Sequence, residues 1–125
     1  MEAKSRHVLA EFYGCPHHLL NDAKSIEQGM CKAALDAGAE IREVAFHKFS
    51  PQGVSGVVII SESHLSIHTW PELGYAAVDV FTCGTTVDPN DAVTYLESIL
   101  EAEQVDRMEI IRGTKIPFKE KITHI

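Results

Sequence analysis

The sequence predicts an α+β fold: a two-layer α/β sandwich in which two helices cover one face of a largely antiparallel sheet. Segments with the two-residue apolar alternation of strands and segments with the apolar period of helices follow one another as strand, helix, several strands, helix and strand. No repeat, low-complexity run or linker interrupts this order, so we expect residues 1–125 to form a single domain. A chain of this length buries roughly two-thirds of the surface that its unfolded form exposes, which is enough for one modest core.

The first strand and the first helix are predicted before residue 39. Residues 7–13 alternate as a strand that ends at Gly14-Cys15-Pro16. Asn21 or Asp22 can cap the following helix, and Gly38 can close it. The inward face of this helix is marked by apolar residues at near-helical spacing, which are Ile26, Met30, Ala33 and Ala37.

Four strands are predicted next, over residues 40–49, 56–60, 65–70 and 76–81. A turn rich in residues that adopt special backbone angles, 50–53, separates the first two. The run 56–60 is apolar at every position after its glycine, which indicates a buried strand.

The C-terminal third contributes a helix and one further strand. Asp88 can cap the helix, with Pro89 at its first position. An inward stripe follows, made of Ala92, Leu96, Ile99 and Leu100. Residues 106–112 then complete the sheet, and we expect residues 115–125 to be loosely ordered.

Composition excludes several kinds of partner. The chain has 18 acidic and 11 basic residues, a net charge of -7, and no dense cluster of Lys and Arg, so we expect neither a nucleic acid nor a membrane as partner. The N-terminus has no apolar signal core, and the longest apolar run is too short to span a bilayer. Three widely separated cysteines, Cys15, Cys31 and Cys83, form no CxxC pair and indicate reduced thiols in the cytoplasm.

The most informative chemistry lies at two predicted strand ends. Ser63 and His68 follow the apolar run 56–60, and Cys83 follows the strand 76–81. These side chains are a possible nucleophile, base and proton donor, the types that covalent catalysis requires. The alternative, which spacing alone favours, is that Ser63 caps a turn, His68 is a satisfied strand histidine and Cys83 is a small buried residue.

The seven histidines do not indicate a metal site. His64 and His68 lie four residues apart in a segment that favours a strand, which separates their side chains by ~13 Å, too far to share a zinc ion. We place His17-His18 in a loop after the first strand and expect no metal there.

The segment ISESHLSIHTWPE (60–72) followed by YAAVDVFTCG (75–84) resembles the signature of the small prokaryotic S-adenosylmethionine decarboxylases, which carry a self-made pyruvoyl group. The resemblance extends to Arg6-His7, to residues 10–13, to Phe46-His47 and to residues 53–58. It ends at Arg112-Gly113, so the tail lies outside it.

This resemblance implies that the chain is a proenzyme. It would cut its own backbone between Glu62 and Ser63, giving a β chain of residues 1–62 and an α chain of residues 63–125. The Ser63 hydroxyl would attack the preceding carbonyl, and elimination followed by hydrolysis would leave a pyruvoyl cofactor at position 63. Serine has both the nucleophilic oxygen and the α proton that this route needs.

The same resemblance implies an activity: decarboxylation of S-adenosylmethionine through a Schiff base to the pyruvoyl group. The product, S-adenosylmethioninamine, would be the aminopropyl donor of spermidine synthesis. His68 matches the family's processing base, Ser55 its helper hydroxyl, and Cys83 the acid that returns a proton to the substrate. The resemblance further implies a homodimer in which each active site takes residues from both subunits.

A substrate with an adenine, a ribose and a sulfonium needs aromatic faces and a carboxylate, because an aromatic face attracts a cation by ~0.5–2 kcal/mol. Phe49, Trp70 and Glu72 flank the signature and are the predicted substrate-binding residues. Core packing is the alternative for both aromatic residues.

Two other functions remain open. A pyruvoyl-dependent arginine or ornithine decarboxylase would need the same Ser63, His68 and Cys83, so the signature supports the cofactor more strongly than the substrate. A non-catalytic small-molecule-binding domain could carry the signature in an inactive form, and its chain would stay uncleaved.

Overall fold

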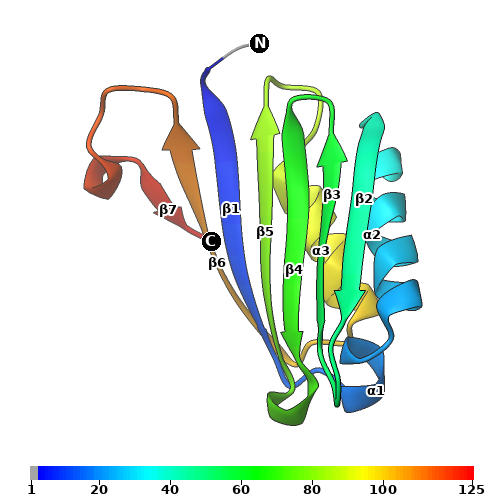
Figure 1. Cartoon of the computed structure of the whole chain (residues 1–125). Coiled ribbons are helices and arrows are strands. Elements are labelled where there is room, and N and C mark those ends of the chain that lie inside the picture. The colour runs from blue at the N-terminus through cyan, green and yellow to red at the C-terminus, as the bar shows by residue number, and fades with distance from the viewer. Residues whose placement is uncertain (1–2) are drawn as a thin grey trace.

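The computed structural model of the protein describes residues 3–125, whose strands form one seven-stranded sheet with helices on one face (Figure 1). The strand order is β2-β3-β4-β5-β1-β6-β7, and every neighbouring pair is antiparallel. The strands are β1 (Ser5–Tyr13), β2 (Ile41–Lys48), β3 (Val54–Ile60), β4 (Ser63–Trp70), β5 (Tyr75–Cys83), β6 (Gln104–Arg112) and β7 (Ile122–His124). The helices are α1 (His17–Leu20), α2 (Ala23–Asp36) and α3 (Pro89–Ile99), with 3₁₀ turns η1 (Pro71–Leu73) and η2 (Phe118–Glu120).

The predicted two-layer α+β sandwich is confirmed. The long helices α2 and α3 pack against each other and lie on the same face of the sheet (Figure 1). Both begin at the predicted caps: the Asp22 carboxylate accepts from the backbone N–H of Ser25, and the Asp88 carboxylate accepts from that of Asn90. No helix within residues 3–125 is both long enough and apolar enough to cross a membrane.

The core lies between the two helices and one face of the sheet. Alternate residues of the central strands point into it, because successive side chains of a strand face opposite sides. Fully buried members include Val8, Phe12, Ile26, Met30, Val58, Ile60, Leu65, Ile67, Val80 and Leu96. This burial fixes the register of β4 and therefore decides which signature residues face away from the core.

Several element boundaries differ from the sequence prediction, and three of the differences concern the signature or the core. Strand β4 begins at Ser63 rather than at residue 65, because its pairing with β3 continues to the pair Ile60 and Ser63. Strand β5 likewise continues to Cys83, which lies opposite Ser5 of β1. Residues 17–20, predicted as a loop, form the single helical turn α1, which the burial of Leu20 in the core stabilises.

The expectation of a loosely ordered tail was wrong. Residues 122–124 form β7, which pairs with β6 at Met108 and His124, and at Ile110 and Ile122. The Lys121 ammonium donates to the Thr114 carbonyl at 3.2 Å and so closes the loop between the two strands. A strand of three residues is too short to give an alternation that could be recognised in the sequence.

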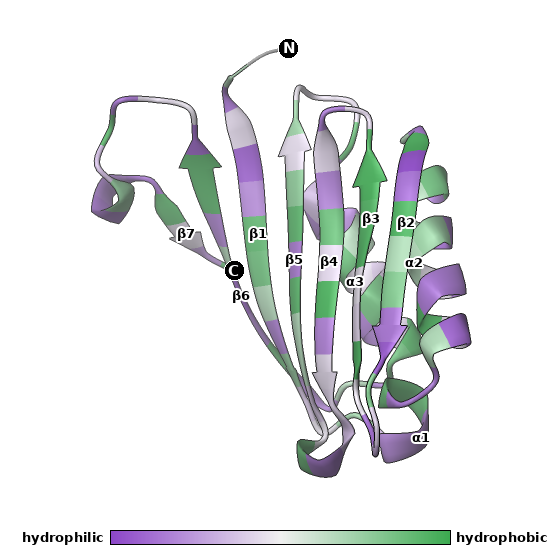
Figure 2. Cartoon of the chain, viewed as in Figure 1, coloured by the Kyte–Doolittle hydropathy of each residue, from purple (hydrophilic) through white to green (hydrophobic). Residues whose placement is uncertain are grey.

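The other face of the sheet, which we call the open face, carries no helix of residues 3–125 (Figure 1). Hydrophilic and hydrophobic residues follow one another along its strands (Figure 2). Large apolar side chains on this face, Leu9, Tyr13, Ile59 and Trp70, are 37–40% exposed. A sheet with one packed face and one face of this composition is suited to cover by another molecule.

An ion pair on the helix-covered face joins β1 to β6. The Arg6 guanidinium donates from Nε to Glu109 Oε2 at 2.8 Å and from Nη2 to Glu109 Oε1 at 2.9 Å. The hydrogen bond from Arg6 lowers the pKa of the Glu109 carboxyl, against an opposing effect of burial. The pair ties β6 to β1, the strand that lies between β6 and β5 in the sheet.

Glu109→Gln is expected to reduce the free energy of unfolding by about 1–2 kcal/mol near neutral pH, because a charge-assisted bidentate contact is lost. Since the folded-state pKa of Glu109 is depressed, this contribution is present above the unfolded value of about 4.3 and disappears as the pH falls below it. Urea unfolding of wild type and variant at several pH values measures the difference. Glu43→Gln, at an exposed position of β2, is the control. If wild type and Glu109→Gln still differed as much in acid as near neutral pH, the ionised Glu109 carboxylate would not be the source of the stabilisation.

Candidate active site

The predicted cleavage site lies in the turn between β3 and β4. Ser61 and Glu62 form this two-residue turn, and Ser63 is the first residue of β4. Glu62 has a φ of 65°, which lies in the left-handed backbone region that residues other than glycine rarely adopt. Such conformations cost about 1–3 kcal/mol and concentrate at functional sites. The peptide bond before Ser63 therefore follows a locally strained residue.

The side chain of Ser63 contacts the end of β5. The backbone N–H of Cys83 donates to Ser63 Oγ at 3.1 Å. Strand β4 pairs with β5 through His64 opposite Phe81, and this register places the last residue of β5 next to the first residue of β4. The predicted nucleophile and the predicted proton donor thus lie together at what we call the Ser63 end of the sheet, where β3 and β5 end and β4 begins.

Ser55 and His68 form a second pair of signature residues. They lie directly opposite each other on β3 and β4, and Ser55 Oγ is 2.8 Å from His68 Nδ1. Both line a cavity of about 330 Å³ together with Phe46 and Gly56. The Phe46 ring lies against the backbone of Gly56, where any Cβ would overlap it, so glycine is required beside the pair. The predicted base and its helper hydroxyl are therefore brought into contact.

The two pairs are far apart within one chain. His68 is five residues from Ser63 along β4, a distance of about 17 Å at the usual rise per residue. An odd spacing also puts their side chains on opposite sides of the strand, and His68 is exposed on the open face. The structure thus unites Ser63 with Cys83 and Ser55 with His68, but it does not unite His68 with Ser63. The role of His68 in cleavage stays a prediction.

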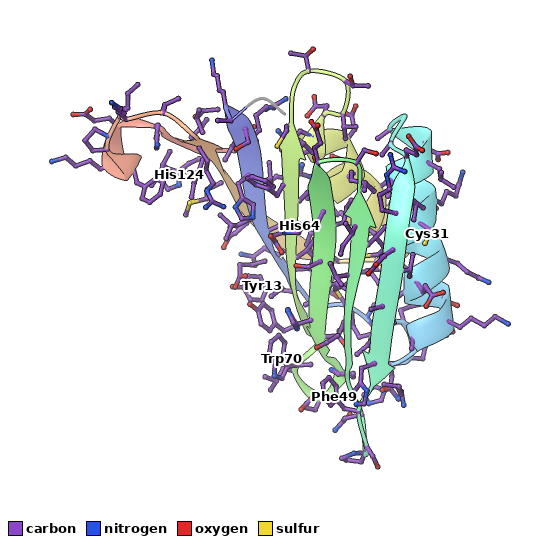
Figure 3. The ribbon with its side chains drawn as sticks, turned by 45° about the horizontal axis from the view of Figure 1, so that its top comes forward. Tyr13, Cys31, Phe49, His64, Trp70 and His124 are labelled. Carbon is purple, nitrogen blue, oxygen red and sulfur yellow. The ribbon has the colours of Figure 1, made fainter. Side chains whose placement is uncertain are left out.

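The three predicted substrate-binding residues lie at the opposite end, which we call the Trp70 end, where β2 and β4 finish and β3 and β5 start. Figure 3 labels Phe49 and Trp70 there and His64 nearer the Ser63 end. Phe49 is 45% and Trp70 is 40% exposed, so neither is a core residue, and Glu72 is exposed in η1. Trp70 lies two residues after His68 on β4, so it shares the open face with His68 and is distant from Ser63 along the strand.

Aromatic rings extend across the open face at the Trp70 end. Trp70 stacks on Tyr75 with centroids 5.2 Å apart, and Tyr75 stacks on Tyr13 at 5.5 Å. The Tyr75 hydroxyl donates to Glu11 at 2.6 Å. Burial, followed by this hydrogen bond, raises the pKa of Tyr75 to about 12. This stack holds the Trp70 ring in place, with one face available to a ligand.

A network of four residues on the open face was missed by the sequence prediction. Asp79 Oδ2 lies 2.6 Å from His7 Nε2 and 3.1 Å from His64 Nε2, and Ser66 Oγ donates to Asp79 Oδ1. Burial alone would raise the pKa of Asp79, but the hydrogen bonds from His64, His7 and Ser66 outweigh it and hold that pKa well below its usual range. The available signal was a single acidic residue in the otherwise uncharged strand β5.

Three of these residues, His7, His64 and Asp79, have the ligand types of a metal site, with their ligand atoms within 4.8 Å of one another. Two contacts disfavour that use. Ligands of a tetrahedral ion held at ~2.0 Å are roughly 3.3 Å apart, whereas the contact of His7 with Asp79 is 2.6 Å. In addition, Arg112 Nη1 lies 3.4 Å from His7 Nδ1, and a guanidinium only donates, so the imidazole proton belongs on Nε2, where a metal would bind. We interpret the cluster as a hydrogen-bond network.

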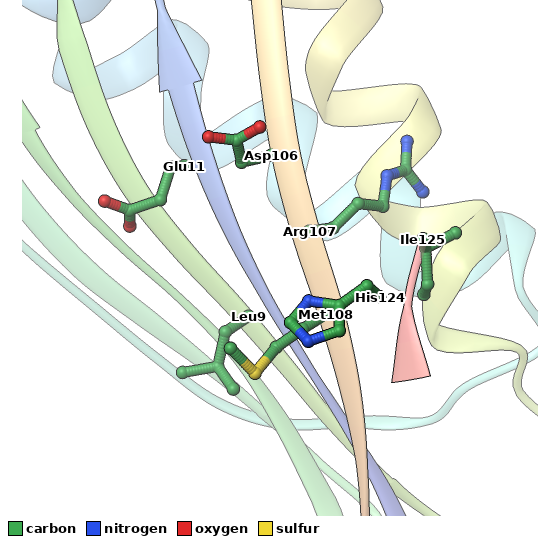
Figure 4. A pocket seen from close by; sticks show the side chains of 7 residues that line it. All are labelled: Leu9, Glu11, Asp106, Arg107, Met108, His124 and Ile125. Carbon is green, nitrogen blue, oxygen red and sulfur yellow. The ribbon is translucent and has the colours of Figure 1, made fainter. Parts of the chain in front are cut away.

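A further cavity of about 500 Å³ lies between β1, β6 and the C-terminus (Figure 4). Glu11 and Asp106 supply carboxylates to its wall, and Leu9, Met108 and Ile125 supply apolar surface. None of the predicted site residues lines it. It is therefore separate from both signature pairs.

Comparison with known proteins identifies the fold and the signature together. The family described as S-adenosylmethionine decarboxylase matches residues 6–113. This chain belongs to that family. The match contains every candidate residue discussed above except those of the C-terminal cavity wall, and it ends where the resemblance read from the sequence ends.

Relatives in the S-adenosylmethionine decarboxylase family are similar over nearly the whole chain. The S-adenosylmethionine decarboxylase proenzyme of Moorella thermoacetica is 68% identical over 94% of this chain and 94% of its own length. The proenzyme of Carboxydothermus hydrogenoformans is 66% identical, over 93% of this chain and 91% of its own.

Two solved structures resemble this one. The adenosylmethionine decarboxylase of Aquifex aeolicus has a TM-score of 0.84 and 31% identity, covering 93% of this chain and 96% of that chain. A Trypanosoma brucei AdoMetDC monomer has a TM-score of 0.63 and 13% identity, covering 83% of this chain and 45% of that chain, and it supports the fold alone.

Proposed function

We propose that this chain decarboxylates S-adenosylmethionine, using a pyruvoyl group that it generates from its own Ser63. Membership of the S-adenosylmethionine decarboxylase family and relatives named as proenzymes support the reaction. The observation that carries the site assignment is the contact of Ser63 with Cys83 directly after the left-handed Glu62. A hydroxyl, a strained peptide and a thiol are thereby gathered at one strand end.

Self-cleavage would start at the Glu62–Ser63 peptide bond. Ser63 Oγ attacks the Glu62 carbonyl carbon, the C–N bond breaks, and the chain is joined by an ester in place of the amide. Removal of the Ser63 α proton then expels the Glu62 carboxylate from the β carbon. Hydrolysis of the remaining dehydroalanine releases ammonia and leaves a pyruvoyl group at the start of the 63–125 chain, with 1–62 as the second chain. Relief of the unfavourable φ at Glu62 favours the first step.

The residues around position 63 fit this group. When formed, the pyruvoyl group would supply a ketone that binds the substrate's amino group and accepts the electron pair left by carbon dioxide. Cys83 is held beside position 63 by the contact of its backbone N–H and is half-buried, so its thiol is our candidate to return a proton to the α carbon.

A second copy of the chain would complete the site. Ser55 and His68 face outward from the open face, and Ser63 lies about 17 Å away along the strand. If two copies pack open face to open face about a two-fold axis that runs across the strands, the Ser63 end of one meets the Trp70 end of the other. The partner would then contribute its Ser55–His68 pair to cleavage, and the exposed apolar residues of this face would be covered. We therefore propose a homodimer with composite sites.

Phe49, Trp70 and Glu72 would bind the substrate at the same composite site. The exposed faces of Phe49 and Trp70 are available for the adenine or the sulfonium, and the Glu72 carboxylate can accept from ribose hydroxyls. The three free thiols suit a reducing cytoplasm, where the product would serve as an aminopropyl donor for spermidine synthesis.

Release of carbon dioxide from carboxyl-labelled substrates tests the substrate assignment. We expect release from S-adenosylmethionine and none above background from arginine or ornithine, because only the first offers the adenine and sulfonium that Phe49 and Trp70 can bind. Cyanoborohydride added during turnover should attach substrate-derived mass to the 63–125 chain and leave 1–62 unchanged. Release from arginine without release from S-adenosylmethionine would overturn the assignment and favour the related amino-acid decarboxylase.

A further inference from the structure

The His7–His64–Asp79 network lies on the open face close to position 63. His64 follows Ser63 in the chain. It shares a face of the sheet with Cys83, because His64 lies opposite Phe81 and Cys83 lies two residues after Phe81 on the same strand. His7 comes from β1 and Asp79 from β5, so three neighbouring strands meet there. The network thus lies next to position 63, but none of its residues has a role in the reaction that the signature implies.

The proton positions in this network follow from its partners. Asp79 is ionised and accepts at both oxygens, so the nitrogens that face it, Nε2 of His7 and Nε2 of His64, must donate. For His7 this is reinforced by Arg112, which can only donate to Nδ1. Both imidazoles therefore carry their proton on Nε2 when neutral, and each presents a lone pair at Nδ1.

The lone pair of His64 is the one that faces no partner. Within residues 3–125 no group is hydrogen-bonded to Nδ1 of His64, whereas His7 Nδ1 has Arg112. The His64 ring is fixed by stacking on Phe81, with centroids 5.6 Å apart and an interplanar angle of 24°. The side chain remains 37% exposed, so Nδ1 is accessible. Nδ1 is also the ring nitrogen nearer the main chain, one peptide bond from position 63.

The reaction needs a proton acceptor at this place. The amino group of the substrate enters as an ammonium and must lose one proton before its nitrogen can bond to the ketone carbon at position 63. The same proton is then needed by the hydroxyl that leaves as water. Cys83 cannot serve while it holds the proton destined for the α carbon, and His68 lies at the far end of the strand in the same chain.

We propose that His64 accepts this proton at Nδ1 and returns it to the departing hydroxyl, and that Asp79 is the positioning residue that holds His64 in the required tautomer. This inference rests on the proposed function. The N–H bond of the ammonium is exchanged for an Nδ1–H bond and back again, so no net proton is gained or lost. His7 and Ser66 fix the Asp79 carboxylate from its other sides.

The charged and titratable groups that face His64 come from several elements. Strand β3 offers only Ile59 opposite it. The others are His7 on β1, Asp79 and Cys83 on β5, and Arg112 on β6, which lies over Phe81 and contacts His7. Of these, Asp79 is the only anion in direct contact, so its removal has the largest effect on the protonation of the His64 ring.

Nitrogen NMR of the ¹⁵N-labelled protein, whether cleaved or whole, tests the tautomer without using activity. We expect His64, assigned by its absence in His64→Gln, to be protonated at Nε2 and unprotonated at Nδ1. In Asp79→Asn this preference should be lost, because an amide can donate as well as accept. Asp106→Asn, an identical change at an exposed position of the same face, should leave it intact. A proton on Nδ1 in wild type, or an unchanged tautomer in Asp79→Asn, would overturn the role of Asp79.

The pH profile of kcat/KM, normalised to cleaved chain, tests the proton transfer. His64→Gln should lower kcat/KM by about 10²-fold near neutral pH, and the loss should shrink as alkaline pH supplies the free amine from solution. In Asp79→Asn, kcat/KM should lie between the values of wild type and of His64→Gln, because the His64 ring is no longer held in the required tautomer. A wild-type profile in His64→Gln would refute the inference. If wild type neither cleaves nor decarboxylates, the proposed function fails, and the NMR result still decides the tautomer.

Discussion

Ser63→Ala is expected to leave the 125-residue chain intact and to abolish decarboxylation. Alanine has no oxygen to attack the Glu62 carbonyl and no leaving group on its β carbon, so neither the cleavage nor the ketone can form. The position is half-buried and its side chain accepts one hydrogen bond, from Cys83 N–H, so the fold should survive at a cost of about 1 kcal/mol.

Intact mass under denaturing conditions measures this result directly. Wild type should give two masses, for residues 1–62 and for a carbonyl-blocked 63–125, while Ser63→Ala gives one. Ser61→Ala is the matched control, because Ser61 lies in the same turn and its hydroxyl contacts Arg42 rather than Cys83. Cleavage should persist in this control. A wild-type chain that stays whole after long incubation would instead favour a non-catalytic small-molecule-binding domain.

The architecture was largely predictable because the two periodicities in the sequence are clear. The caps at Asp22 and Asp88 and the apolar stripes of α2 and α3 follow from local chemistry. The strand β7 was missed because three residues carry no measurable period, and α1 was missed because burial of Leu20, a tertiary contact, stabilises a single turn.

The site was predictable only in part, for a geometrical reason. The identities of Ser63, His68 and Cys83 follow from the resemblance, but their distances depend on strand register and on which face each residue occupies. Ser63 and Cys83 meet because β4 and β5 run antiparallel with His64 opposite Phe81. The Asp79 network was not predicted, because it joins β4 and β5 to β1, which is distant from both in sequence.

Co-expression of two inactive variants should restore activity if the site is shared between copies. Ser63→Ala supplies intact Ser55 and His68 from its Trp70 end, and His68→Ala supplies intact Ser63 and Cys83 from its Ser63 end. In a mixed dimer one of the two composite sites has all its residues. With random pairing about half of the dimers are mixed, so decarboxylation should reach about a quarter of the wild-type rate, from a background near zero for either variant alone.

The pattern of restoration tests which residues act together. In the mixture only the His68→Ala chains should be cut, and intact mass distinguishes them from the Ser63→Ala chains. Ser63→Ala combined with Cys83→Ala is the matched control: both changes fall in the same half of the site, because Ser63 contacts Cys83 of its own chain, so no mixed dimer contains a complete site and activity should stay at background. The proposed division of residues between copies would be wrong if decarboxylation were restored in this control. It would also be wrong if decarboxylation were not restored in the first mixture although both variants fold and dimerise. The about 17 Å between Ser63 and His68 along β4 is the physical reason for expecting the stated pattern, since a strand within a paired sheet cannot fold back to close that distance.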